Sequence, residues 1–140
     1  MRISKSVIWT AVLLGSLVAV PDRAAAAQDV WFCTLKTARN SFVMKEIVVA
    51  VDEAAGTAIV NDALIQHLIG TPVAARVTGN DAKQTRLKWV VKGIPATATR
   101  TATVNYRATL TKASGRISVT AQPQGADNTF LDSGTCARQK

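Results

Sequence analysis

The chain has 140 residues, 48% of them hydrophobic, and 17 Lys and Arg residues against 9 Asp and Glu residues. Its length fits one domain and excludes a large multidomain enzyme, while its apolar content excludes an intrinsically disordered protein. Two cysteines are too few for a zinc ribbon or a disulfide-dense miniprotein, and a single histidine leaves little from which to build a transition-metal site.

Residues 1–27 have the pattern of a secretory signal peptide. Arg2 and Lys5 form a positive start, an apolar run covers residues 7–20, and four alanines at 24–27 suit signal peptidase. The apolar run is shorter than the roughly 20 residues that a membrane-spanning helix needs. We therefore expect cleavage after Ala26 or Ala27 and export of a single domain, residues 28–140. That domain would be periplasmic or secreted and would not span the membrane.

From residue 28 onward, apolar and polar residues alternate in short stretches that turn residues separate, as is typical of β-strands. The exception is 63–70, where apolar residues recur at helical spacing, so we expect a helical turn whose apolar side packs on the core. The longest alternation is rich in threonine, which favours a strand over a helix. The predicted strands are residues 30–36, 42–52, 57–61, 73–78, 86–92, 97–112, 117–121 and 129–136.

About eight short strands joined by short turns predict an all-β fold, a small antiparallel up-and-down β-barrel with a β-sandwich as the alternative. Cys33 and Cys136 favour the barrel. In an oxidising compartment we expect them to form a disulfide, which requires Cα atoms within about 7 Å and so places the first strand beside the last. Gly134 is expected to mark the bend where the sheet closes. The cysteines have no CxxC spacing, so a redox or metal role is not indicated.

The inward faces of these strands predict the barrel interior. Four aromatic residues are expected there, namely Trp31, Trp89, Tyr106 and Phe130. Small residues such as Ala98, Ala102 and Ala108 leave room for a ligand pocket above Trp89 and Tyr106. The other interpretation, which we favour, is an interior filled by larger side chains such as Ile47 and Leu87.

The sequence has few residues from which to build a catalytic site. There is no GxSxG motif, and the only histidine, His67, lies in the apolar 63–70 segment, where we expect it to be packed or solvent-facing. Most acidic residues fall in turns, and glycine patterns for dinucleotides or phosphates and EF-hand loops are absent. We therefore expect no enzyme activity, no cofactor and no metal.

The distribution of charge is more informative. Residues 82–126 contain eight basic residues and no acidic one, which predicts a basic outer surface that attracts anions. Lipid headgroups, envelope polysaccharide or an acidic protein are the candidate partners. Nucleic acid is not expected, because the aromatic residues needed for base stacking face inward. The alternative is that these charges only keep the surface soluble. The candidate anion-binding residues are Arg76, Arg86, Lys88, Lys92 and Arg107.

The pattern resembles small exported barrels of the lipocalin-like kind. A Trp-x-Cys near the start (Trp31, Cys33), a Trp followed closely by Lys92 and Gly93, and a late cysteine also resemble periplasmic lysozyme-inhibitor barrels. The second resemblance implies a protein–protein role such as inhibition of an envelope hydrolase, although the basic charge opposes binding to a basic lysozyme. The sequence thus predicts an exported, non-catalytic binding module for an anionic or amphipathic ligand or envelope component, with hydrolase inhibition as the alternative.

Overall fold

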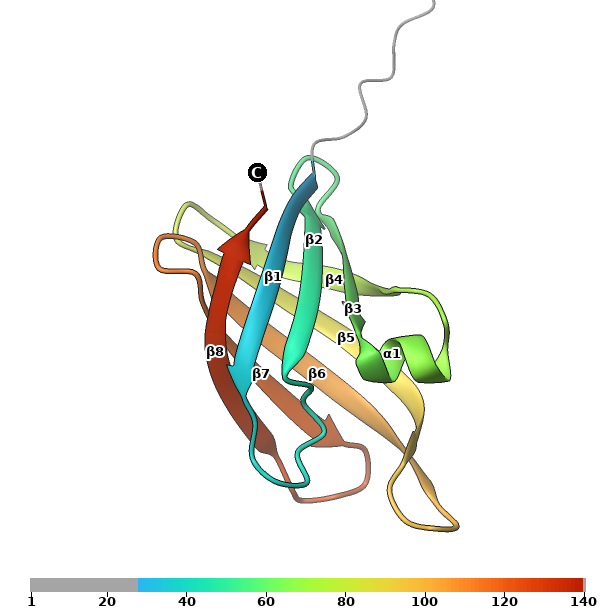
Figure 1. The fold of residues 1–140 in the computed structure, drawn as a ribbon. Coiled ribbons are helices and arrows are strands. Elements are labelled where there is room, and N and C mark those ends of the chain that lie inside the picture. Colours follow the sequence, from blue (N-terminus) through green and yellow to red (C-terminus); the bar gives the residue numbers. More distant parts are fainter. Residues whose placement is uncertain (1–27, 140) are drawn as a thin grey trace, which may run out of the picture.

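The computed structural model describes residues 28–139 as one closed antiparallel barrel with a single short helix (Figure 1). The strands pair in chain order and β8 returns to pair with β1, so the predicted up-and-down barrel is confirmed and the sandwich is not observed. The predicted signal peptide, residues 1–27, lies outside the described residues. The elements are β1 Gln28–Lys36, β2 Glu46–Asp52, β3 Thr57–Asp62, α1 Ala63–Leu68, β4 Val73–Asn80, β5 Gln84–Pro95, β6 Thr101–Thr111, β7 Arg116–Pro123 and β8 Phe130–Arg138.

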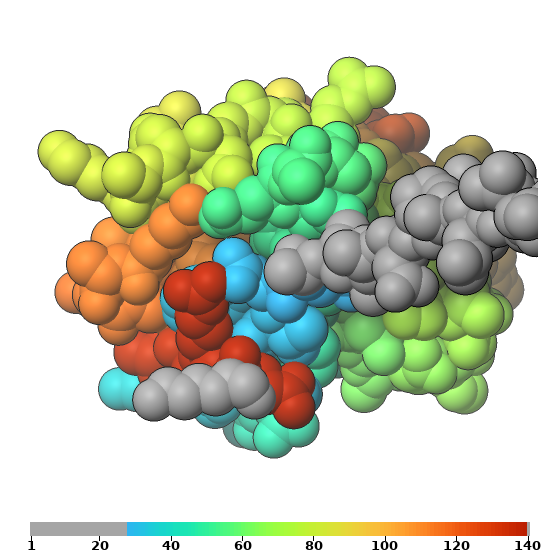
Figure 2. All heavy atoms as spheres, turned by 90° about the horizontal axis from the view of Figure 1, so that it is seen from above, coloured from blue at the N-terminus to red at the C-terminus, as the bar shows by residue number. Residues whose placement is uncertain are grey.

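The seam between β1 and β8 closes the barrel. Cys33 lies directly opposite Cys136, with Cα atoms 3.9 Å apart, and the two form the predicted disulfide. In the view from above, the end of β8 lies beside the start of β1 (Figure 2). Two residues before Cys136, Gly134 passes so close to β1 that a Cβ atom there would lie 2.0 Å from the Thr34 carbonyl oxygen. The seam therefore needs a glycine at this position.

The barrel interior is filled by one cluster of apolar side chains. Trp31, Trp89 and Tyr106 are buried in it as predicted, and the Trp89 and Tyr106 rings stack with centroids 5.2 Å apart. Phe130 is half-buried at one end, edge-on to Phe42. Every second residue of each strand points into the barrel and contributes to this cluster. Its largest fully buried members include Ile47, Leu87, Leu110, Val60, Val104 and Val119. The packing supports the filled interior over the ligand pocket.

Most strand boundaries differ from the predicted ones by a few residues, and three of the differences have a clear structural cause. Residues 42–45 belong to the β1–β2 loop, although Val43 is buried like a strand residue because the loop crosses the barrel end. Residues 97–100 form the β5–β6 hairpin, so Ala98 is exposed and does not line the interior. The predicted fourth strand ends at residue 78, before an expected turn at residues 79–81. In the structure β4 continues to Asn80, because a bulge between Val77 and Gly79 keeps it paired with β5.

The β1–β2 loop is anchored by Asp132, a buried carboxylate that the sequence analysis did not single out. Its Oδ1 accepts a hydrogen bond from the Ala38 backbone N–H at 3.1 Å, and its Oδ2 accepts one from the Ser41 hydroxyl at 2.5 Å. The Ser41 oxygen in turn accepts from the Val43 N–H. These bonds hold Val43 over the core at the end of the barrel.

Helix α1 covers part of the same end. The Asp62 carboxylate caps it by accepting from the Ile65 N–H at 2.8 Å, and Gly70, with φ of +85°, follows its last turn. Ile65 is fully buried and Leu64 and Leu68 pack against the core, as expected from their spacing, while His67 is exposed. Among residues 28–139 there is no helix of the length and hydropathy that a membrane span requires.

Asp62 provides a test of the cap. Burial raises the pKa of its carboxyl and outweighs the opposing effect of the Ile65 and Leu64 N–H groups, so the ionised form is less stable in the folded protein. Asp62→Asn keeps an acceptor for the cap, and we expect it to be at least as stable as the wild type at neutral pH. The difference should disappear as the pH falls and the wild-type carboxyl is protonated. Asp62→Ala should lose about 1 kcal/mol. Urea unfolding at several pH values measures both, and a neutral-pH loss for Asp62→Asn as large as that for Asp62→Ala would contradict the assignment.

Candidate functional site

The five predicted anion-binding residues lie together on the outer face of β4, β5 and β6, and we call them the basic patch. All five are exposed. Arg76 lies directly opposite Lys88, and Lys88 lies directly opposite Arg107, so three cations form a row across three adjacent strands. Along β5, positions alternate between the faces, which places Arg86, Lys88 and Lys92 on the same side of the sheet. The patch is therefore a cross centred on Lys88.

No side chain among the described residues forms an ion pair with the row. Like charges directly opposite one another on neighbouring strands are destabilising. The ion pairs among residues 28–139 are Lys112 with Glu53 and Arg138 with Asp29, and neither involves the basic patch. Asp81 in the β4–β5 turn interacts with one member of the patch, Arg86, and Asp52 on β2 lies in line with the row, separated from Arg76 by Thr57. The pKa of Asp81 is lowered mainly by the Gln84 and Lys83 N–H groups, and less by the charges of Arg86 and Lys112.

A groove of about 190 Å³ runs beside the row on the outer surface of β5, β6 and β7. Its polar lining combines Lys88 and Arg107 with uncharged hydrogen-bonding groups, namely Asn105, Thr120 and Gln122. An anion here meets both cationic and neutral polar groups. The rings of Trp89 and Tyr106 belong to the same strands but are buried in the barrel, so this face offers no aromatic platform for stacking.

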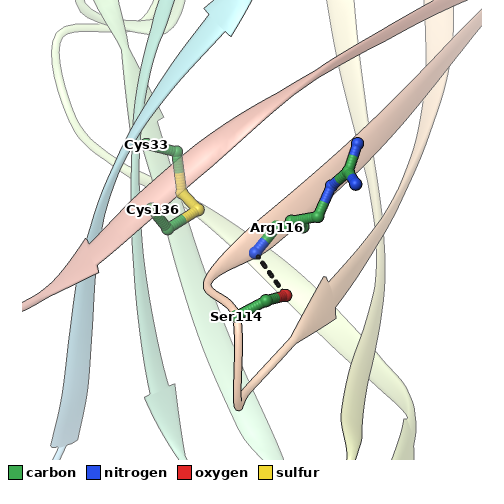
Figure 3. Close-up of a disulfide and its surroundings, with 4 residues drawn as sticks. All are labelled: Cys33, Ser114, Arg116 and Cys136. Atoms are coloured by element: carbon green, nitrogen blue, oxygen red, sulfur yellow. Dashed lines mark hydrogen bonds between the residues drawn. A yellow bond between two sulfur atoms is a disulfide. The ribbon is translucent and has the colours of Figure 1, made fainter.

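A second, larger groove of about 550 Å³ crosses the outer surface of β7, β8 and β1, and the sequence analysis missed it. Two exposed cations, Lys36 and Arg116, line it together with the hydroxyls of Thr34, Ser133 and Thr135. Figure 3 shows the Arg116 side chain extending away from the nearby disulfide, while the Arg116 N–H donates to the Ser114 hydroxyl. The alternation in the sequence predicts that Lys36 and Arg116 point outward. It does not predict that they lie close together, because that depends on the register of β8 with β1 and β7.

The barrel end beside the chain termini is closed by charged residues. A recess of about 220 Å³ has Trp31, Val51 and Thr85 at its base. The Lys112–Glu53 and Arg138–Asp29 ion pairs line the rim, and the Arg138 guanidinium lies 5.6 Å from the Trp31 ring centroid. These charges are already matched by one another. The outer surface therefore offers unmatched charge, and this end of the barrel does not.

The titratable groups His67 and Asp132 occupy different environments. His67 is exposed on α1, and the buried carboxylate of Asp132 is engaged by the Ser41 hydroxyl and the Ala38 N–H. Within residues 28–139, no three His, Cys, Asp or Glu side chains are grouped so that they could hold a metal ion.

No protein family, curated protein or solved structure matches this chain. The resemblance to lysozyme-inhibitor barrels thus gains no support from these comparisons, and the function has to be argued from the surface geometry. The two outer grooves and the basic patch combine exposed cationic side chains with uncharged hydrogen-bonding groups.

Tyr106 supplies a probe of the buried end of the barrel. Its hydroxyl donates to the Phe42 carbonyl oxygen at 2.8 Å, and burial, with a smaller effect from the Asp62 charge, raises its pKa well above the ordinary value near 10. Because the folded state holds this proton more tightly than the unfolded state, its contribution to stability is complete below pH 10 and is lost as the pH rises further. The chain has one tyrosine, so phenolate absorbance reports this residue alone.

We expect the phenolate signal to appear together with loss of the circular dichroism signal at alkaline pH, rather than at pH 10 in the folded protein. Tyr106→Phe should cost about 1 kcal/mol at neutral pH, because the Phe42 carbonyl loses its donor. It should also weaken the pH dependence above 10. A folded protein whose tyrosine titrates at the ordinary pKa would contradict the buried hydrogen bond.

Proposed function

We propose that this protein is an exported, non-catalytic binding protein that holds an anionic component of the cell envelope on the basic patch. The observation that carries the proposal is the row of Arg76, Lys88 and Arg107, three exposed cations on adjacent strands that form no ion pair with any residue of the described part of the chain. An anion placed on this row would relieve the repulsion between its members. Clefts and surfaces of one sign of charge also raise the local concentration of oppositely charged partners.

The outer surface is favoured over the barrel interior as the binding site. The interior is packed with apolar side chains, and one end is rimmed by two ion pairs while the other is covered by α1 and the β1–β2 loop. A purely solubilising role for the basic residues is less favoured, because solubility is served by dispersed charges of both signs. Alignment of like charges in register has a cost in stability that solubility does not require.

Export is supported by two observations of different kinds. The first is the disulfide between Cys33 and Cys136, a bond that forms and persists in oxidising compartments such as the periplasm or the exterior. The second is the signal-like pattern of residues 1–27, with its short apolar run and alanine-rich end. Both are consistent with an envelope or extracellular ligand.

The basic row is tested by the triple variant Arg76→Gln, Lys88→Gln, Arg107→Gln. We expect its affinity for immobilised heparin, a polyanion probe, to fall by about tenfold or more at low salt. Relief of the like-charge contacts should leave the free energy of unfolding unchanged or raise it by up to about 1 kcal/mol. Affinity chromatography and urea unfolding measure the two effects.

The matched control removes three cations that lie elsewhere, Arg39→Gln, Lys45→Gln and Arg100→Gln. These residues lie in the β1–β2 loop and the β5–β6 hairpin, and all are exposed. Because the net charge changes equally, the control should lose much less affinity than the patch variant. Equal losses in the two variants would mean that heparin senses only the net charge, and the assignment of a site would be wrong. Binding that survives high salt would instead favour an apolar protein–protein contact.

A further inference from the structure

We infer that the anionic ligand is a linear acidic polysaccharide that lies across the strands, from the basic patch to the groove of Lys36 and Arg116. This inference rests on the proposed function, since it uses the basic patch as one end of the binding surface. It extends that function by naming the class of ligand and by adding a second, distant set of contacts.

A continuous polar row connects the two ends. The row runs from Arg86 on β5 to Lys36 on β1. It has one residue on each strand, and each residue lies directly opposite the next one on the neighbouring strand. The residues between these two cations all carry hydroxyls, namely Thr109, Ser118 and Ser133. With neighbouring strands about 4.8 Å apart, the row is about 19 Å long. A second row ends beside it, in which Arg116 lies opposite Thr135 and Thr135 opposite Thr34.

The chemistry of this strip fits a polymer whose charges are separated by neutral hydroxyl groups. Two arginine guanidinium groups, Arg86 at the β5 end and Arg116 on β7 beside the middle of the row, can hold carboxylate or sulfate groups in a bidentate way. Lys36 supplies the positive charge at the β1 end. The serine and threonine hydroxyls along the row both donate and accept, as sugar hydroxyls require. Within the described residues no acidic side chain lies in either row between β5 and β1, and the residue opposite Thr34 on the next strand, β2, is Glu46.

The shape of the strip separates this ligand from the other polyanions. From β5 to β1 the row takes four of the eight steps around the closed barrel. A flat bilayer cannot contact half the circumference of a barrel, whereas a flexible chain can follow it. Single-stranded nucleic acid is bound mainly by aromatic platforms on which successive bases stack. Phe32, on β1, is the one exposed Phe, Tyr or Trp side chain among residues 28–139, so stacking of successive bases is not available.

The experiment compares short and long probes of the same chemistry. Isothermal titration of the wild type with an acidic disaccharide and with a chain of about ten sugar units, both prepared from heparin, should give an affinity at least about tenfold tighter for the longer chain. The double variant Lys36→Gln, Arg116→Gln should lose that length dependence and keep its affinity for the disaccharide within about threefold. The control variant Arg39→Gln, Lys45→Gln should keep both affinities.

The outcomes separate this inference from the proposed function. If the patch variant Arg76→Gln, Lys88→Gln, Arg107→Gln binds both probes as the wild type does, the proposed function fails. If the patch variant loses binding but the Lys36 and Arg116 variant keeps its length dependence, the proposed function stands and the extended path is wrong. Tighter binding to anionic phospholipid vesicles or to single-stranded DNA than to the long polysaccharide, at equal salt, would also overturn the ligand class.

Discussion

Replacement of both cysteines by alanine is expected to lower the free energy of unfolding by about 4 to 5 kcal/mol. Cys33 and Cys136 are 103 residues apart in the chain, so their bond restricts nearly the whole unfolded domain. A cross-link that closes a loop of this length removes more conformational freedom from the unfolded chain than one that closes a short loop. Urea unfolding of the oxidised wild type and of the double variant measures the difference.

Chemical reduction of the wild type is the control for this prediction, because it opens the bond without changing the side chains. The reduced wild type and the double variant should unfold at similar urea concentrations, both well below the oxidised protein. We also expect amide exchange to increase first at the β1–β8 pairing, which the bond holds directly, and last at the β5–β6 pairing. Equal stability of the oxidised and reduced protein would mean that strand pairing alone holds the seam.

Gly134→Ala is expected to cost about 3 kcal/mol or more, because an alanine methyl cannot be placed without separating β8 from β1. A Cβ atom at this position would lie 2.0 Å from the Thr34 carbonyl oxygen and 2.6 Å from the Leu35 Cα. These are backbone atoms of a paired strand, so no side-chain rotation relieves the contact. Overpacking of a rigid site commonly costs about 1 to 3 kcal/mol, and here a strand pairing is lost in addition. Thermal or urea unfolding measures the loss.

Gly79→Ala is the matched control, since Gly79 is also a strand glycine with an ordinary φ. A Cβ atom there would meet only the Arg86 side chain, at 3.8 Å, which is a normal contact. We expect a change within about 0.5 kcal/mol although Gly79 adjoins the bulge at Val77, because the added methyl group meets only a flexible side chain and the φ of Gly79 is one that alanine adopts. If Gly134→Ala is as mild as Gly79→Ala, the close approach of β8 to β1 is not a feature of the protein in solution.

Much of the fold could be predicted from the sequence because the period of two is strong in every strand. The alternation through Leu87, Trp89 and Val91 assigned the inward face correctly, and the two cysteines required the first and last strands to meet. Strand ends were predicted less well. Val43 continues the alternation although Asp132, far away in sequence, holds its segment as a loop. Threonine and alanine likewise alternate across residues 97–103, and this pattern does not indicate that the hairpin turns at residues 97–100.

The candidate site could be predicted only in part. Parity alone placed Arg76, Lys88 and Arg107 outside, and the structure confirms that they are exposed. Their alignment in one row could not be read from the sequence, because it depends on register, and bulges after Val77 and Val91 shift the register on both sides of β5. The groove of Lys36 and Arg116 was missed for the same reason, since its two sides come from opposite ends of the chain.

The order of the strands has a consequence for when the molecule can fold. Because β8 supplies one of the two neighbours of β1, the barrel cannot close until β8 has been synthesised. Such long-range pairing is slow, and in a reducing cytoplasm the bond that secures it does not form. For the exported protein that we propose, this topology delays assembly until after translocation. On this proposal the chain would cross the membrane unfolded and would close into a barrel only on the far side.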